Sequence, residues 1–179
     1  MAAIEGGPAP FPDSDVPGRL FPVCCAAVIS PEILDKFFYD MTDHFPQAND
    51  SFVIVDSLTG SYTEEMEPGG DESTSSTSPF IGKSPYECSQ LLKQLRRDTG
   101  SDIDYNSFII MDERTLRDNT ILIVEEPEEA DGGASNSVRA TFELASNLLL
   151  YLSGKSSAYE QRELAETTED GVLRPGMHH

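Results

Sequence analysis

Short apolar segments alternate with amphipathic segments along this chain, and that alternation constrains its fold more than any other feature. Residues 23–29 are continuously apolar, as expected of a strand buried on both faces. Ser30, Pro31 and Glu32 then combine an N-cap hydroxyl, a proline at the first helical position and an acid in the first turn. Apolar residues at helical spacing follow on one face: Ile33, Leu34, Phe37, Phe38, Met41 and Phe45. A second strand is expected at residues 51–56.

The second half of the pattern begins with another helix start. Ser84 and Glu87 form a capping-box sequence around Pro85, and Gly100 stands where a glycine would end the helix. Strands are predicted at 107–112 and 120–125, joined by a connection too short for a helical crossover, so these two should pair antiparallel. A last helix is predicted over 138–152, with these side chains facing inward: Val138, Phe142, Ala145, Leu148, Leu149 and Leu152.

The resulting order, β-α-β-α-β-β-α, predicts an α/β fold, with an α+β fold as the alternative. Each β-α-β passage requires parallel neighbours joined by a right-handed crossover. We therefore expect a four-stranded mixed sheet packed by three helices. One domain should span residues 21–154. Residues 1–20 are expected to be a disordered, Pro/Gly-rich lead-in, residues near 60–80 and 126–137 flexible acidic loops, and residues 155–179 a polar tail.

The composition limits the classes of partner. The formal net charge is -20, from 32 acidic and 12 basic residues. Phosphate backbones and anionic membrane surfaces are bound by clustered Lys and Arg, so nucleic acid and membrane are not expected partners. Residues 60–80 hold five acids and no base, and residues 126–137 hold four acids and no base. The negative charge is therefore concentrated in the predicted loops, and it is not evidence for an acidic binding pocket.

Compartment is inferred from the N-terminal sequence and the cysteines. The first residues carry neither a basic segment nor an apolar run, so no signal peptide is predicted. No stretch approaches the roughly 18 apolar residues of a membrane span. Cys24, Cys25 and Cys88 make an odd count, and two of them are adjacent. An intracellular protein, expected in the cytoplasm, fits these features best.

Two similar ten-residue stretches of the sequence suggest a possible ligand-binding or catalytic site. Residues 50–59, DSFVIVDSLT, resemble residues 106–115, NSFIIMDERT, and place Asp56 and Asp112 at the ends of two strands. Both strands follow a helix, so both carboxylates should lie at the carboxyl edge of the sheet, where open α/β sheets bind ligands. They could hold Mg²⁺, or act as a paired acid and base. The alternative, which we favour, is that each Asp caps the turn after its strand, helped by Thr59 or Thr115.

Arginines follow the third predicted strand in an otherwise acidic chain. Arg114 and Arg139 are candidate ligand-binding residues, because a guanidinium can hold a carboxylate with two parallel hydrogen bonds. Structural pairing with a nearby aspartate is the favoured alternative. The P-loop, the dinucleotide-binding glycine pattern, the Cys-x-x-Cys pair and the His-Glu-x-x-His pair do not occur in the sequence.

The second half of the chain also resembles a known family. The stretches SFIIMDERTLRDNTILIVEE and VRATFELASNLLLYLSG, separated by an acidic gap, are similar to a small α/β domain family of unknown function found in fungi and bacteria. The resemblance covers about a third of the chain. It implies a sheet-plus-helix fold and no known activity, and it assigns no catalytic residue.

These observations favour a non-enzymatic intracellular binding or scaffold module that uses the carboxyl edge of its sheet to hold a protein or a small molecule. The alternative is a small enzyme or Mg²⁺-binding protein that uses Asp56 and Asp112. Homodimerisation is a third possibility, because strand 120–125 would offer a pairing surface if it lay uncovered at the sheet edge.

Overall fold

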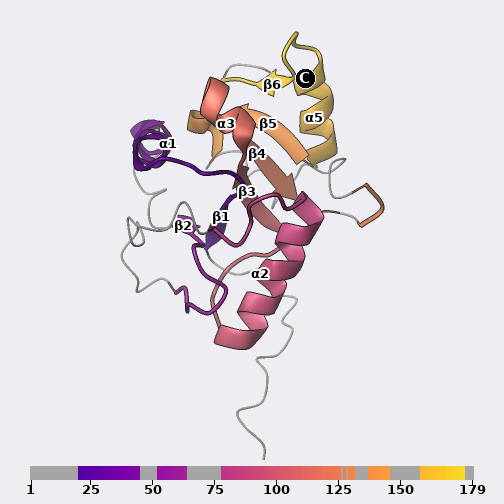
Figure 1. The fold of residues 1–179 in the computed structure, drawn as a ribbon. Helices are drawn as coiled ribbons and strands as arrows, with labels where there is room; N and C mark the ends of the chain where they lie inside the picture. Colours follow the sequence, from indigo (N-terminus) through magenta and orange to yellow (C-terminus); the bar gives the residue numbers. More distant parts are fainter. Residues whose placement is uncertain are drawn as a thin grey trace, which may run out of the picture.

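The structure is a computed structural model that describes residues 20–44, 52–63, 78–125, 127, 129–131, 137–145 and 158–175. Its centre is a six-stranded mixed sheet with strand order β2-β1-β3-β4-β5-β6 (Figure 1). The strands are β1 (Phe21–Cys25), β2 (Phe52–Ile54), β3 (Ser107–Met111), β4 (Thr120–Glu125), β5 (Ser137–Thr141) and β6 (Val172–Leu173). The α/β class is confirmed, while the sheet holds two more strands than predicted.

The parallel part of the sheet matches the sequence pattern. β1 pairs in parallel with β2 on one side and with β3 on the other, in the register Val23↔Ile54 and Val23↔Ile109. The chain therefore leaves β1 toward β2 and returns to β3 across β1. This reversal makes the carboxyl ends of β1 and β3 the topological switch point of the sheet, the position where open α/β sheets bind ligands.

Two helices cover opposite faces of this parallel unit (Figure 1). Helix α1 (Pro31–His44) buries Phe37 and Met41 against one face, and helix α2 (Pro85–Thr99) buries Leu92 and Leu95 against the other. Neighbouring strand residues alternate between the two cores, so that Cys24 joins the α2 side while Cys25 joins the α1 side. Burial on both faces explains why β1 is continuously apolar.

The predicted ends of α2 are confirmed. Ser84 accepts a hydrogen bond from the Glu87 backbone N–H at 3.2 Å, and the Glu87 carboxylate accepts one from the Ser84 N–H at 3.1 Å. At the other end Gly100 adopts φ 71°, a left-handed conformation that lets its N–H close the last turn on the Arg96 carbonyl.

The antiparallel half of the sheet corrects several predictions. β4 pairs antiparallel with β3, as expected, but the connection between them forms a short helix, α3 (Glu113–Asp118). β4 also pairs with β5, so strand 120–125 lies inside the sheet and is not an edge. The edge strands of the described sheet are β2 and β6.

The helix predicted from residue 138 is wrong at its start, where β5 lies instead, followed by a 3-10 turn, η5 (Phe142–Leu144). Val138 and Ala140 face the α1-side core, and Arg139 points to the other face. The spacing of Val138, Phe142 and Ala145 fits a helix, but the alternation at 138–140 fits a strand, and pairing with β4 decides between them. Residues 146–152 lie outside the described residues.

The predicted polar tail is also revised. Residues 155–179 include helix α5 (Ala158–Glu166) and strand β6, which pairs in parallel with β5. Ala165 and Leu173 are buried in the same core as Phe37. Burial of few but well-placed apolar side chains is enough to fix this segment.

The predicted lead-in and loops fall mostly outside the described residues, namely 1–19, 64–77 and 132–136. The described ends of the 60–80 segment belong to the core, because Tyr62 and Phe80 are buried on the α2 side. A second short turn, η3 (Glu129–Asp131), lies between β4 and β5. Among the described helices, none has both the length and the apolarity needed to cross a bilayer.

Candidate functional site at the carboxyl edge

The structure places Asp56 and Asp112 at the same edge of the sheet, as expected, but on strands separated by β1. Asp56 follows β2 by two residues, and Asp112 follows β3 directly. β2 and β3 are two strand spacings apart, roughly 10 Å. The described contacts give the two carboxylates different partners.

Asp112 caps helix α3. Its Oδ1 accepts hydrogen bonds from the Thr115 backbone N–H at 3.2 Å and from the Thr115 hydroxyl at 3.3 Å, and Thr115 Oγ1 in turn accepts the Asp112 N–H at 3.0 Å. This reciprocal box satisfies backbone groups that the helix leaves without partners. The favoured prediction, that Asp112 and Thr115 cap the turn after the strand, is therefore confirmed.

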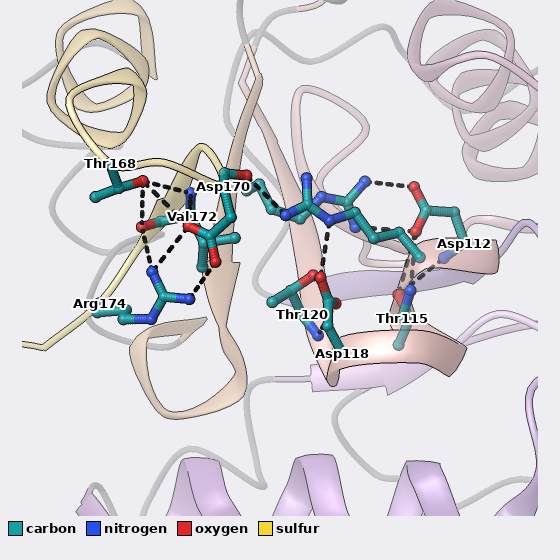
Figure 2. Close-up of polar contacts among 10 residues, drawn as sticks. Asp112, Thr115, Asp118, Thr120, Thr168, Asp170, Val172 and Arg174 are labelled. Atoms are coloured by element: carbon teal, nitrogen blue, oxygen red, sulfur yellow. Dashed lines mark hydrogen bonds and ion pairs between the residues drawn. The ribbon is translucent and has the colours of Figure 1, made fainter.

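The same carboxylate binds Arg139 through both oxygens (Figure 2). Arg139 Nη1 donates to Oδ1 at 2.9 Å and Nη2 donates to Oδ2 at 2.5 Å, and the Arg139 side chain is only 12% exposed. Burial would raise the pKa of Asp112, but the Arg139 hydrogen bonds and charge, with Thr115, outweigh it and hold the pKa below its ordinary value. Asp112 therefore stays ionised at neutral pH and is a poor general acid.

Arg114 is paired as well. Its Nε donates to Asp118 Oδ2 at 2.8 Å, and its Nη2 donates to the Asp170 carbonyl at 2.7 Å. Asp118 also accepts the Thr120 N–H at 3.2 Å and the Thr120 hydroxyl at 2.5 Å. These contacts lower the pKa of Asp118 although partial burial would raise it. Arg114 thus ties helix α3 to the turn before β6.

A third pair completes this polar network (Figure 2). Both oxygens of Asp170 accept from Arg174, with Nη1 to Oδ1 at 3.0 Å, and Oδ1 also accepts the Val172 N–H at 3.3 Å. The Arg174 hydrogen bonds, more than any other contact, lower the pKa of Asp170. The network thus joins three aspartates to three arginines, one to one. It links the middle of β5 to the residue after β3 through Arg139, and helix α3 to the turn before β6 through Arg114.

Asp56 has a different partner, Tyr62. The Tyr62 hydroxyl donates to Asp56 Oδ1 and accepts the backbone N–H groups of Asp56 and Ser57, each at 3.1 Å. The Tyr62 backbone is held in turn by Ser101 Oγ at 2.9 Å and by the Asp102 N–H at 2.8 Å. Burial, followed by Asp56, raises the pKa of Tyr62. Asp56 therefore fixes the segment after β2 rather than capping a turn with Thr59.

The Mg²⁺ hypothesis gains no support from these contacts. In the part of the chain that the structure describes, no group of three or more His, Cys, Asp or Glu side chains is placed to hold a metal ion. Asp112 uses both oxygens on Arg139, and Asp56 uses one on Tyr62. A metal held by this pair stays a prediction.

The cysteines are core residues. Cys24, Cys25 and Cys88 are free thiols and all three are buried. Burial, with a smaller contribution from Asp56, raises the pKa of Cys25 to about 11, and burial also raises the pKa of Cys24. Neither thiol forms the thiolate that nucleophilic chemistry requires at neutral pH.

The junction at the switch point itself was not predicted from the sequence. The Ala26 N–H donates to the Met111 carbonyl at 2.8 Å, and the Ala26 carbonyl accepts the Gly82 N–H at 3.3 Å. Ser78 Oγ also donates to the Cys25 carbonyl at 2.6 Å. Three segments far apart in the sequence, which follow β1, precede α2 and follow β3, are therefore joined at one point.

Each of these segments exposes a large apolar side chain. Val28 is 57% exposed, Ile81 is 41% exposed and Leu116 is 44% exposed, and we call these three residues the edge triad. Val28 and Ile81 lie within two residues of the hydrogen-bonded Ala26 and Gly82, at about 3.8 Å per step. The exposure of Val28 could not be predicted from the sequence, because Val28 continues the apolar run of a strand that ends at Cys25.

No family model matches this chain, and neither the curated proteins nor the solved structures contain a significant match. The fold and the contacts described above therefore carry the functional argument alone.

Proposed function

We propose that this chain is a non-enzymatic binding module that recognises a protein segment at the carboxyl edge of β1 and β3. The observation that carries this proposal is the edge triad. Val28, Ile81 and Leu116 come from three segments joined at the switch point, and each leaves at least 41% of its surface exposed. Val28 and Ile81 each lie within two residues of the Ala26–Gly82 hydrogen bond. Exposed apolar side chains on segments that meet indicate an interaction site, whereas singly scattered ones need no explanation.

The surroundings favour a rigid platform. Asp112 and Arg139 fix the start of α3 against β5, and Arg114 fixes the same helix to the turn before β6. Tyr62 fixes the segment after β2. Groups that are already ordered lose less conformational entropy when a partner binds. These ion pairs and hydrogen bonds therefore favour a higher affinity for the partner.

The same contacts weigh against the enzymatic alternative. An acid–base pair needs two carboxylates whose pKa values are pushed apart within one site. Asp112 is committed to Arg139 and Thr115, and Asp56 hydrogen-bonds Tyr62. An enzyme or Mg²⁺ protein built on these residues stays a prediction without a supporting contact.

Selection from a displayed peptide library tests the proposal. Wild-type protein is the bait, and the triple variant Val28→Ser, Ile81→Ser, Leu116→Ser is the comparison. Tyr39→Ser is the matched control, because Tyr39 is 70% exposed and lies on α1 away from the junction. We expect sequences enriched on the wild type and on the control to be lost on the triple variant. Equal enrichment on all three proteins, or none, would refute the proposed site.

A further inference from the structure

Helix α5 and strand β6, residues 158–173, form the outermost part of the described sheet, and we call them the C-terminal strap (Figure 1). β6 is two residues long and pairs in parallel with β5 through Arg139↔Val172 and Ala140↔Leu173. On its other side, β5 pairs with β4 along its whole length. The strap is therefore joined to β5 by a much shorter hydrogen-bonded ladder than the one that joins β5 to the rest of the sheet.

A small set of apolar side chains packs the strap against the protein. Ala165 of α5 and Leu173 of β6 are buried in the core on the α1 side, and Leu164 packs partly against that core. Val172 is also fully buried, and its alternation with Leu173 directs it to the opposite face of the sheet. Since local stability follows the buried apolar contacts of a segment, we expect the strap to be less stable than β1 and β3.

Contacts inside the strap hold the turn between α5 and β6 (Figure 2). Thr168 Oγ1 accepts the Val172 N–H at 3.1 Å, and both oxygens of Asp170 accept from Arg174. These contacts do not depend on β5 or α3, so they persist when the strap moves. The strap can therefore move as one preformed unit.

The Arg114 guanidinium connects the strap to helix α3. Its Nη2 donates to the Asp170 carbonyl at 2.7 Å, across 56 positions of the sequence, while its Nε binds Asp118 on its own helix. β5 has a separate attachment, because Arg139 binds both oxygens of Asp112 next to β3. Loss of the strap therefore leaves the contacts that hold β5 in place.

We propose that the C-terminal strap is a gate on the outer edge of β5: it detaches as one piece while β1 to β5 stay paired, and Arg114 controls how often it does so. Detachment frees the backbone groups of β5 that β6 occupies, and an edge with free N–H and C=O groups can pair with another strand. Elements that move in regulation are drawn from the least stable parts of a fold. The inference is independent of the proposed function, because it concerns a different edge of the sheet.

Hydrogen exchange of the full chain in low concentrations of urea, followed by mass spectrometry, tests this proposal. We expect α5 and β6 to exchange together, and faster than β1 and β3. Arg114→Met keeps an apolar stem and loses the Asp170 contact. It should raise the exchange rate of the strap about two- to tenfold, the effect of one hydrogen bond, and leave β1 and β3 at the wild-type rate.

Two control variants separate the Asp170 contact from other effects on α3. Asp118→Asn removes the ion pair within α3 but keeps an oxygen that can accept from Thr120, and Arg117→Met changes an exposed residue of the same helix. Both should leave the strap near its wild-type exchange rate. Leu173→Ala acts on the strap itself and should speed its exchange by at least about thirtyfold, because a buried leucine is lost.

Each outcome decides one part of the proposal. Equal exchange in the strap, β1 and β3 would mean that the protein opens only as a whole, and different rates in α5 and β6 would mean that they do not move as one piece; either result overturns the gate. If Arg114→Met matches Asp118→Asn, or also speeds exchange in β1 and β3, the control by Arg114 is refuted. Leu173→Ala then decides detachment alone, since faster exchange confined to the strap supports the gate and faster exchange throughout the sheet refutes it.

Discussion

The Arg139–Asp112 ion pair gives the sharpest test of how this edge is held together. Arg139→Met removes the guanidinium and keeps an apolar stem of similar length. Asp112, whose side chain is 29% exposed in the wild type, then keeps its Thr115 hydrogen bonds but loses its only described cation. Exposed pairs contribute about 0.2–1 kcal/mol, and removing one partner of a fully buried pair costs about 3–5 kcal/mol. Because this pair is half-buried, we expect Arg139→Met to lower the free energy of unfolding by about 2 kcal/mol, between those two limits.

The measurement is urea denaturation at neutral pH, with the midpoint converted through the slope of the wild type. Asp112→Asn is the matched single variant, because Asn retains the N-cap role and removes the charge. The double variant completes a cycle that isolates the coupling between the two side chains. A loss below about 0.5 kcal/mol for Arg139→Met, or additive effects in the cycle, would refute the reasoning.

The pH dependence of this pair has a definite sign. The folded pKa of Asp112 is lowered, so its contribution to stability is fully present above the ordinary Asp value of about 3.9 and is lost as pH falls through the lower folded pKa. The stability difference between wild type and Arg139→Met should therefore be constant near neutrality and shrink below about pH 4. A difference that grows on acidification would contradict the pairing.

Three further changes should give measurable results. Tyr62→Phe removes the hydroxyl that serves two backbone N–H groups and one carboxylate, and should cost about 1–3 kcal/mol in urea denaturation, while the exposed Tyr39→Phe should be neutral. Ser84→Ala breaks the capping box of α2 and should lower the unfolding free energy by about 1 kcal/mol, whereas Ser84→Asn should retain most of it. Millimolar Mg²⁺ should leave the melting temperature unchanged, because the described carboxylates already have protein partners; a rise that Asp112→Asn abolishes would restore the metal-site hypothesis.

Asp112 and Asp56 differ in how far their hydrogen-bond partners could be predicted from the sequence. Capping by Asp112 is local, because Thr115 is three residues away, and that contact could be predicted from the sequence. The Arg139 contact spans 27 positions and could not, because it depends on β5 pairing with β4. Asp56 ends a similar stretch of sequence, yet its carboxylate accepts a hydrogen bond from the Tyr62 hydroxyl. The reason is that the chain after β2 turns back over the α2 side of the sheet.

The sequence by itself determined the local elements of this protein. The apolar runs of β1, β3 and β4 and the caps of α2 follow from burial on two faces and from backbone groups that must find partners at helix ends. A parallel unit of three strands follows from them, and so does the shared edge of Asp56 and Asp112. These features depend on neighbours within a few residues or on connection length, and both can be taken directly from the chain.

Only the tertiary structure decided which segments complete the sheet and what the edge presents. Residues 137–141 could satisfy a helical or an alternating pattern, and hydrogen bonding to β4 selected the strand. β6 is two residues long and acquires its place from β5 and from the core beneath α5. Val28 is exposed because β1 ends at Cys25 and because the residues on either side of Val28 are the ones that are buried. Long-range pairing sets these outcomes, since burial depends on what lies opposite a side chain rather than on the residues next to it.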